Sequence, residues 1–190
     1  MMSNTPQRRA IVTGGSGDLG GAICRRLAAD GTHVIVHANA NLARAETVVA
    51  DIRAAGGSAE AVAFDVADGE ATRQAIDALL QAGPIQVVVN NAGVTIIGTV
   101  EHLTIEEIEW QLGINLWGVI YGTKAFLPML LEQRRGCIVN ISSIFGLIAY
   151  PGQSAYNISK FGVRGLTECL WAELEGTGVR ALSVHPGGIR

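Results

Sequence analysis

The chain has 190 residues, of which 48% are hydrophobic and 16% charged, enough for one domain with a sizeable core. Its formal charge of −3 and its scattered Lys and Arg form no basic stripe, which argues against nucleic acid as a partner. No uninterrupted apolar run approaches the roughly 20 residues that span a bilayer, and the stretch Met1–Arg9 is polar, so we expect no membrane and a cytoplasmic location.

Cysteine and histidine spacing points to neither disulfides nor a metal site. We expect reduced, mostly buried thiols at three separated positions, Cys24, Cys137 and Cys169. Metal-ligand spacing is missing among the histidines, for which a structural or surface role is expected: His33, His37, His102 and His185. We therefore predict no metal.

Short apolar runs alternate with segments of helical period along the whole chain. The strands are predicted at Ala10–Thr13, His33–His37, Ala61–Phe64, Ile85–Asn90, Gly136–Ser142 and Arg180–His185. The helices are predicted at Gly20–Ala29, Leu42–Ala55, Glu70–Gln81, Ile105–Gln133 and Ser154–Glu175. This alternation predicts a Rossmann-type α/β fold over residues 1–190, with a doubly wound parallel sheet of about six strands between two helical layers.

A glycine-rich turn follows the first predicted strand and opens the first helix. It runs through Thr13, Gly14, Gly15, Ser16, Gly17, Asp18, Leu19 and Gly20. Small residues let the backbone approach a pyrophosphate, which then faces the amides and the positive end of the helix dipole. The alternative is a tight turn without a ligand.

The end of the second strand bears on which dinucleotide binds. Enzymes that prefer NAD usually place a carboxylate there, whereas this chain has Ala38, with Asn39, Asn41 and Arg44 after it as possible ligands of a 2′-phosphate. The sequence favours NADP, with NAD as the alternative.

Three further residues lie after the fifth predicted strand, one at its end and two on the helix that follows. Tyr156 and Lys160 are four residues apart and share one helix face, a spacing that by itself also occurs as surface decoration. Ser143 follows the fifth strand, at the edge where the active sites of doubly wound sheets gather.

These motifs together resemble the classical short-chain dehydrogenase/reductase family. The family's T-G-x-x-x-G-x-G loop is matched at Thr13, Gly14 and Gly20, and its N-N-A-G segment at Asn90, Asn91, Ala92 and Gly93. Its catalytic tetrad is matched at Asn115, Ser143, Tyr156 and Lys160, its adenine-contacting pair at Asp65 and Val66, and its P-G turn at Pro186 and Gly187, followed by Ile189. Asp18 departs from the loop, where the family has glycine, and we expect it to cap the helix instead.

The resemblance implies hydride transfer between a nicotinamide dinucleotide and a ketone or secondary alcohol, as in 3-oxoacyl-[acyl-carrier-protein] reductases. Tyr156 would be the general acid and base, and Lys160 would supply positive charge and hold the nicotinamide ribose. Ser143 would bind the substrate oxygen and Asn115 a relay water, while Ser142 points elsewhere.

The family also implies a homodimer or homotetramer, and a C-terminal segment that we expect this chain to lack. The alternative function is a nucleotide-binding or interaction protein with little turnover. Apolar residues near the site indicate either a hydrophobic substrate or ordinary core: Ile144, Leu147, Ile148, Tyr150 and the loop Val94–Thr99.

Overall fold

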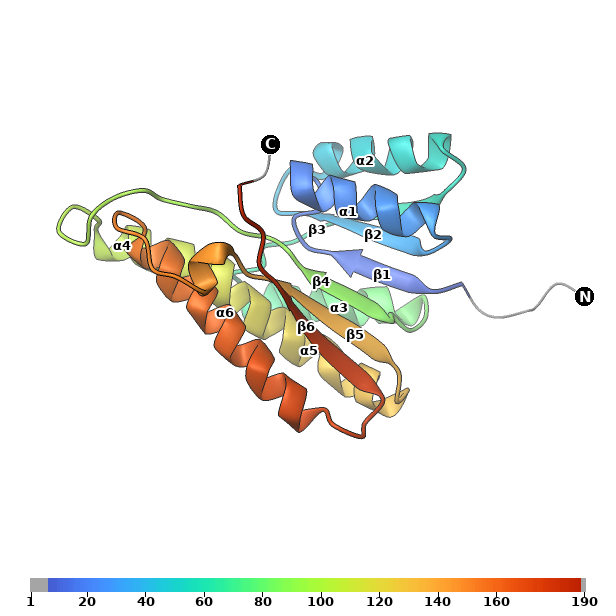
Figure 1. Ribbon diagram of the computed structural model, residues 1–190. Helices are drawn as coiled ribbons and strands as arrows, with labels where there is room; N and C mark the ends of the chain where they lie inside the picture. Colours follow the sequence, from blue (N-terminus) through green and yellow to red (C-terminus); the bar gives the residue numbers. More distant parts are fainter. Residues whose placement is uncertain (1–6, 189–190) are drawn as a thin grey trace, which may run out of the picture.

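A parallel sheet organises the part of the chain that the structure, a computed structural model, describes, residues 7–188. Six strands in this range pair in the order β3-β2-β1-β4-β5-β6 (Figure 1). They are β1 (Arg9–Val12), β2 (His33–Ala38), β3 (Ser58–Ala63), β4 (Val87–Asn90), β5 (Gly136–Ile141) and β6 (Val179–Val184). This is the strand order of the dinucleotide-binding folds, so the predicted fold class is confirmed.

Helices connect the strands and cover both faces of the sheet. They are α1 (Asp18–Ala29), α2 (Leu42–Ala54), α3 (Gly69–Gln81), α4 (Ile105–Leu112), α5 (Gly118–Glu132) and α6 (Ser154–Glu173). A π-helical segment, η1 (Gly113–Trp117), joins α4 to α5, and a short 3₁₀ turn, η2 (Ile144–Gly146), follows β5. In Figure 1, α1 and α2 lie on one face, and α3, α5 and α6 on the other.

Each face of the sheet has its own apolar core. Val34 and Val36 of β2 pack with Val48 of α2 on one side, whereas Ile35 packs on the other side with Phe126 of α5. Successive residues of β2 thus enter opposite layers while all remain buried, as in a strand covered on both faces.

The predicted helix Ile105–Gln133 is one continuous helical stretch with an irregular centre. The π segment η1 adds a residue to one turn, and α5 ends at Glu132. The hydrophobic period covers the whole stretch and therefore does not reveal a local change in backbone hydrogen bonding.

The stretch Ile105–Glu132 is, in residues 7–188, the one helix long and apolar enough to cross a membrane by length and composition. It packs within the fold against α3, α6, β4 and β5. It has three buried polar residues, Gln111 and Asn115 at 0% and Thr123 at 3% exposure. These contacts identify it as a core helix, and its apolar composition follows from that position.

β1 and β4 are neighbours, but the chain leaves β1 through α1 on one face and reaches β4 through α3 on the other. This is the point at which the strand order reverses. The loops after β1 and β4 diverge there, and in open α/β sheets ligands bind in the resulting crevice at the carboxyl ends of the strands.

Candidate active site

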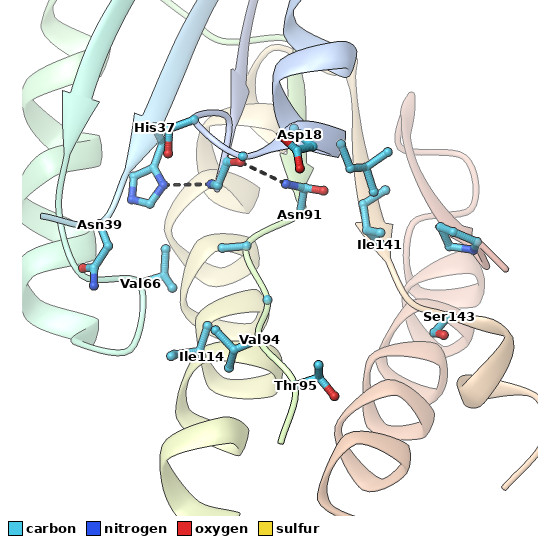
Figure 2. A pocket seen from close by; sticks show the side chains of 18 of the residues that line it. Asp18, His37, Asn39, Val66, Asn91, Val94, Thr95, Ile114, Ile141 and Ser143 are labelled. Atoms are coloured by element: carbon cyan, nitrogen blue, oxygen red, sulfur yellow. Dashed lines mark hydrogen bonds between the residues drawn. The ribbon is translucent and has the colours of Figure 1, made fainter. Parts of the chain in front are cut away.

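A cavity of about 520 Å³ opens at the carboxyl ends of the strands. Figure 2 shows Asn39 and His37 on one side of it and Ser143 on the other. The predicted site residues that line it are Gly14, Ser16, Gly17, Asp18, Leu19, Gly20, Asn39, Asp65, Val66, Asn91, Ala92, Gly93, Ser143, Tyr156, Lys160, Pro186 and Gly187. Thr13 and Asn115 lie behind the wall, and Ile189 falls outside the described residues.

The turn after β1 is fastened to β4 through Thr13 and Asn91. The Thr13 hydroxyl oxygen accepts the backbone N–H groups of Asn91 at 2.9 Å and Ala92 at 3.0 Å. In return, Asn91 Nδ2 donates to the carbonyl oxygens of Thr13 at 2.9 Å and Gly14 at 3.3 Å. Thr13 therefore holds the turn against the segment after β4, and Asn91 joins the two loops that flank the cavity.

Two glycines leave the turn open for a phosphate group. Gly14 has a φ of +64°, which favours glycine. A Cβ on Gly20 would collide with the carbonyl oxygen of Gly14. The turn leads into the N-terminus of α1, where free amides and the helix dipole attract anions. This cradle fits the pyrophosphate of a dinucleotide.

The expectation that Asp18 caps α1 is wrong. Gly17 holds the N-cap position with an extended backbone, φ −89° and ψ 175°, and no side chain caps the helix. Asp18 is already the first helical residue, and its exposed side chain lines the cavity. An acidic residue in a first turn interacts favourably with the helix dipole, which explains its tolerance there without a cap.

The segment after β2 separates into ligand-facing and structural residues. Asn41 caps α2 by accepting the backbone N–H of Arg44 at 3.3 Å, and it does not line the cavity. Asn39 and Arg44 do line it. Asp65, after β3, accepts the backbone N–H of Ala67 at 2.9 Å while also reaching the cavity wall. Asn39 and Arg44 therefore remain the groups available to a 2′-phosphate.

His37 belongs to the site although its sequence context gave it only a structural or surface role. Its ring is 1% exposed and lines the cavity at the end of β2. It accepts the backbone N–H of Gly14 at 3.0 Å and donates to the carbonyl of Phe64 at 2.8 Å. The sequence carries no signal for this role, because both hydrogen-bond partners of the ring are backbone groups of segments distant along the chain.

The serine, the tyrosine and the lysine converge at the opposite end of the cavity. Lys160 Nζ lies 5.5 Å from the centre of the Tyr156 ring. Phe145 packs edge-on against that ring, with centroids 6.2 Å apart. Ser143 ends the extended backbone after β5, and its hydroxyl oxygen accepts the backbone N–H of Phe145 at 3.1 Å. This bond leaves the hydroxyl hydrogen free to donate.

Lys160 is buried beside the tyrosine with few partners. It is 4% exposed, and its Nζ donates to the backbone carbonyl of Ile141 at 2.9 Å. Burial lowers the pKa of Lys160 from 10.5 to about 8. The amine can therefore lose and regain a proton close to neutral pH, as a proton relay requires.

Asn115 fixes the loop after β4 from the π segment. Its Nδ2 donates to the Val94 carbonyl at 2.8 Å and to the Ser159 hydroxyl at 3.2 Å, and its Oδ1 accepts the Val94 N–H at 2.8 Å. Gly93 lies between Asn115 and Lys160, since a Cβ there would be 3.4 Å from Oδ1 and 3.6 Å from Nζ. The missing side chain leaves a space within reach of both polar groups.

Gln111 is a second positioning residue that sequence reasoning missed. It lies one helical turn before Asn115, is 0% exposed, and donates through Nε2 to the Val94 carbonyl at 3.2 Å. Its Oε1 accepts the Ile96 N–H at 3.4 Å. The sequence shows only that a glutamine lies in a predicted helix. Its role becomes visible once the structure shows that this position faces the interior.

Ser142 contacts the backbone of α6. Its hydroxyl donates to the Lys160 carbonyl at 2.9 Å and is 2% exposed. A Cβ on Gly146 would collide with the same hydroxyl. Although Ser142 contributes to the cavity wall, its hydroxyl hydrogen is committed to α6, whereas that of Ser143 is free to donate into the cavity.

The apolar residues after β5 are surface residues and not core. Their exposed fractions range from 42% to 58%: Ile144, Leu147, Ile148 and Tyr150. Of the loop 94–99, Val94 and Thr95 line the cavity.

The turn after β6 closes the cavity from the remaining side. The Pro186 carbonyl accepts the N–H of Ile144 at 2.9 Å, and Pro186 and Gly187 both line the wall.

Comparison with known proteins places this chain in one family. The short chain dehydrogenase family model matches residues 8–190. An oxidoreductase of Mycobacterium tuberculosis named SadH is 39% identical over 192 residues, covering 100% of this chain and 69% of its own length. A 3-oxoacyl-[acyl-carrier-protein] reductase of Synechocystis is 39% identical over 181 residues, covering 95% of this chain and 73% of its own. This chain is therefore shorter than both relatives.

A solved structure shares the whole architecture. A metagenomic short-chain oxidoreductase crystallised with NADP superimposes with a TM-score of 0.91 at 34% identity, covering 95% of this chain and 82% of that one. The strand order, the glycine-rich cradle and this match agree with one another. The chain belongs to the short-chain dehydrogenase/reductase family and is an NAD(P)-dependent oxidoreductase.

Proposed function

We propose that this chain catalyses NADP(H)-dependent interconversion of a ketone and a secondary alcohol, with Tyr156 as general acid and base. The observation that carries the proposal is the placement of Ser143, Tyr156 and Lys160 at one end of a cavity whose other end is the glycine-rich cradle. When bound, the dinucleotide supplies or accepts the hydride.

Tyr156 protonates the substrate oxygen during reduction and takes the proton back during oxidation. The Lys160 ammonium near its ring favours the phenolate, since a nearby positive charge stabilises an anion. The free hydroxyl hydrogen of Ser143 is directed to the oxygen on which negative charge develops. Tyr156 and Ser143 therefore act on the same substrate atom, and Lys160 acts through Tyr156.

Lys160 and Asn115 form the start of a proton path to solvent. A water in the space left by Gly93 would lie within reach of Lys160 Nζ and Asn115 Oδ1. The lowered pKa of Lys160, about 8, suits an amine that passes protons between this water and the tyrosine.

Preference for NADP rests on the segment after β2. Arg44 supplies a positive charge and Asn39 an amide at the cavity wall, and no carboxylate directly follows the strand. Two similar solved structures are complexes with NADP. We expect Arg44→Ala to weaken NADPH binding about tenfold and to leave NADH binding unchanged, since one charge-assisted contact is lost.

The experiment that tests the reaction mixes the protein with NADPH and a panel of ketones, and follows the absorbance of the reduced cofactor. Tyr156→Phe should lower kcat by about 10²- to 10⁴-fold while NADPH still binds. Tyr121→Phe on α5 is the matched control, because Tyr121 lies outside the cavity and stacks on Trp117. Undiminished turnover in Tyr156→Phe would refute the assignment.

The comparisons give no support to a nucleotide-binding protein without turnover. Binding of NADPH with no reaction on a broad panel would nevertheless favour that alternative. The panel should include ketones with long apolar groups, since the exposed side chains after β5 are apolar.

We also infer a homo-oligomer that acts on a small molecule as one catalytic domain. Three half-exposed tryptophans lie on the helical layer: Trp110, Trp117 and Trp171, at 51%, 49% and 51%. Burying such side chains between copies removes apolar area from water. Sedimentation of the purified chain tests this, and a monomer at all concentrations would refute it. The cytoplasmic location rests on the sequence alone.

A further inference from the structure

We infer that His37 is a positioning residue for the cofactor, which holds the glycine-rich turn in its phosphate-binding conformation. This inference rests on the proposed dinucleotide site and adds a residue to it. His37 lies at the carboxyl end of β2 and touches the turn after β1 and the end of β3. One buried ring thus links three segments that contribute residues to the adenosine half of the cavity.

The hydrogen bonds of the ring determine its protonation. A backbone N–H can only donate, so the Nδ1 atom that receives the Gly14 N–H at 3.0 Å carries no proton. A carbonyl can only accept, so the Nε2 atom 2.8 Å from the Phe64 oxygen carries one. The ring is therefore neutral, with its hydrogen on Nε2. Burial lowers the pKa of His37 to about 4, which agrees with that state.

His37 holds the turn at two points. Its ring binds the N–H of Gly14, and its own carbonyl accepts the N–H of Ser16 at 3.2 Å. The Gly14 carbonyl in turn accepts the N–H of Gly17 at 3.1 Å and Nδ2 of Asn91 at 3.3 Å. The dashed lines in Figure 2 show the His37 and Asn91 bonds meeting at the turn.

These bonds decide which amides can bind phosphate. The amides of Gly14, Ser16 and Gly17 are occupied within the protein, and the first-turn amides of α1 are left to face the cavity. Without the ring, the Gly14 N–H loses its partner in a partly buried position. The positive-φ conformation of Gly14 then loses one of the bonds that define it.

Asparagine and glutamine separate the two ring contacts. The Oδ1 of His37→Asn occupies nearly the position of Nδ1 and can still accept the Gly14 N–H. The Nε2 of His37→Gln reaches nearly the position of the ring Nε2 and can still donate to Phe64. If the contact with the turn matters for cofactor binding, the asparagine variant should retain affinity and the glutamine variant should lose it.

The test measures NADPH binding by fluorescence titration, together with kcat at saturating cofactor and the melting temperature. We expect His37→Asn to stay within about threefold of the wild-type Kd, and His37→Gln and His37→Phe to raise the Kd about tenfold. The kcat at saturating NADPH should change less than about twofold, because the ring does not touch the reacting end. If His37→Phe does not fold, the asparagine and glutamine variants carry the comparison.

The matched control is His33→Asn on the same strand. His33 lies at the opposite end of β2, where its ring contacts Ser58 at 2.7 Å and Glu60 at 3.2 Å, outside the cavity. This variant should lower the melting temperature and leave the Kd for NADPH unchanged. If His37→Gln binds NADPH as tightly as the wild type, or if His37→Asn weakens binding as much as His37→Gln does, the inference is wrong.

Amide hydrogen exchange separates this inference from the proposed function. Without cofactor, the Gly14 amide should be protected in the wild type and in His37→Asn, and should exchange faster in His37→Gln. Equal protection in all three proteins would overturn the role of the ring. The three proteins could follow this exchange pattern while the wild type binds no dinucleotide. That result would refute the proposed function and leave the contact between His37 and the turn established.

Discussion

Replacing Lys160 by methionine should abolish turnover and stabilise the cofactor-free protein. Burial lowers the pKa of Lys160 from 10.5 to about 8, because the folded state disfavours the charged form. One pKa unit corresponds to about 1.36 kcal/mol, so the ammonium costs the folded state about 3 kcal/mol at neutral pH. In the variant the Ile141 carbonyl loses its hydrogen-bond donor, and this loss reduces the gain in stability by about 1 kcal/mol. We therefore expect a net gain of about 2 kcal/mol in the free energy of unfolding.

The sign of the pH dependence follows from the same shift. Between about pH 8 and pH 10.5 the unfolded state binds more protons at this lysine than the folded state, so wild-type stability rises with pH. Methionine does not titrate. The advantage of Lys160→Met should therefore be full below about pH 8 and should disappear as the pH approaches 10.5.

Urea denaturation of the cofactor-free protein at neutral pH and near pH 10.5 measures this difference. Lys124→Met on α5 is the matched control, because Lys124 is exposed and the change should stay within about 0.5 kcal/mol at both pH values. The reasoning is refuted if Lys160→Met is less stable than the wild type at neutral pH, or if its advantage is the same at both pH values.

Two substitutions test other contacts that the structure defines. Gly20→Ala should weaken NADPH binding about tenfold or more, since its Cβ collides with the Gly14 carbonyl, whereas Gly165→Ala meets open space and should leave binding unchanged in the same titration. Asn140→Leu should lower the free energy of unfolding by about 1–3 kcal/mol, because it leaves the buried Asn90 Nδ2, now 2.8 Å from Asn140 Oδ1, without this acceptor. A urea midpoint equal to that of the wild type would contradict the second expectation.

The alternation of strands and helices was readable because it depends on local pattern. Buried parallel strands are continuously apolar, and helices repeat their apolar residues at a helical spacing, so both give a signal within a short window. The edge strand β3 was placed late, at Ala61 instead of Ser58, because it is only half covered and its residues mix polar and apolar types. The π segment gave no signal, since it shifts the hydrogen bonds without changing the apolar pattern.

The candidate site likewise contains residues that could be predicted from the sequence and residues that could not. Ser143, Tyr156 and Lys160 were singled out because their spacing resembles the family's catalytic pattern, and the structure places all three on the wall of one cavity. Asp18 was misassigned because capping depends on one backbone dihedral, and Gly17 already supplies the extended residue.

By itself, the sequence determined the order of the elements, the glycine-rich turn and the residues for which we propose a role in proton transfer. Only the tertiary structure decided which buried polar groups position them: His37 on Gly14, Gln111 and Asn115 on Val94. The reason is physical. Each of these bonds joins a side chain to a backbone group at least 17 residues away, and such partners are set by the packing of the sheet and its helices.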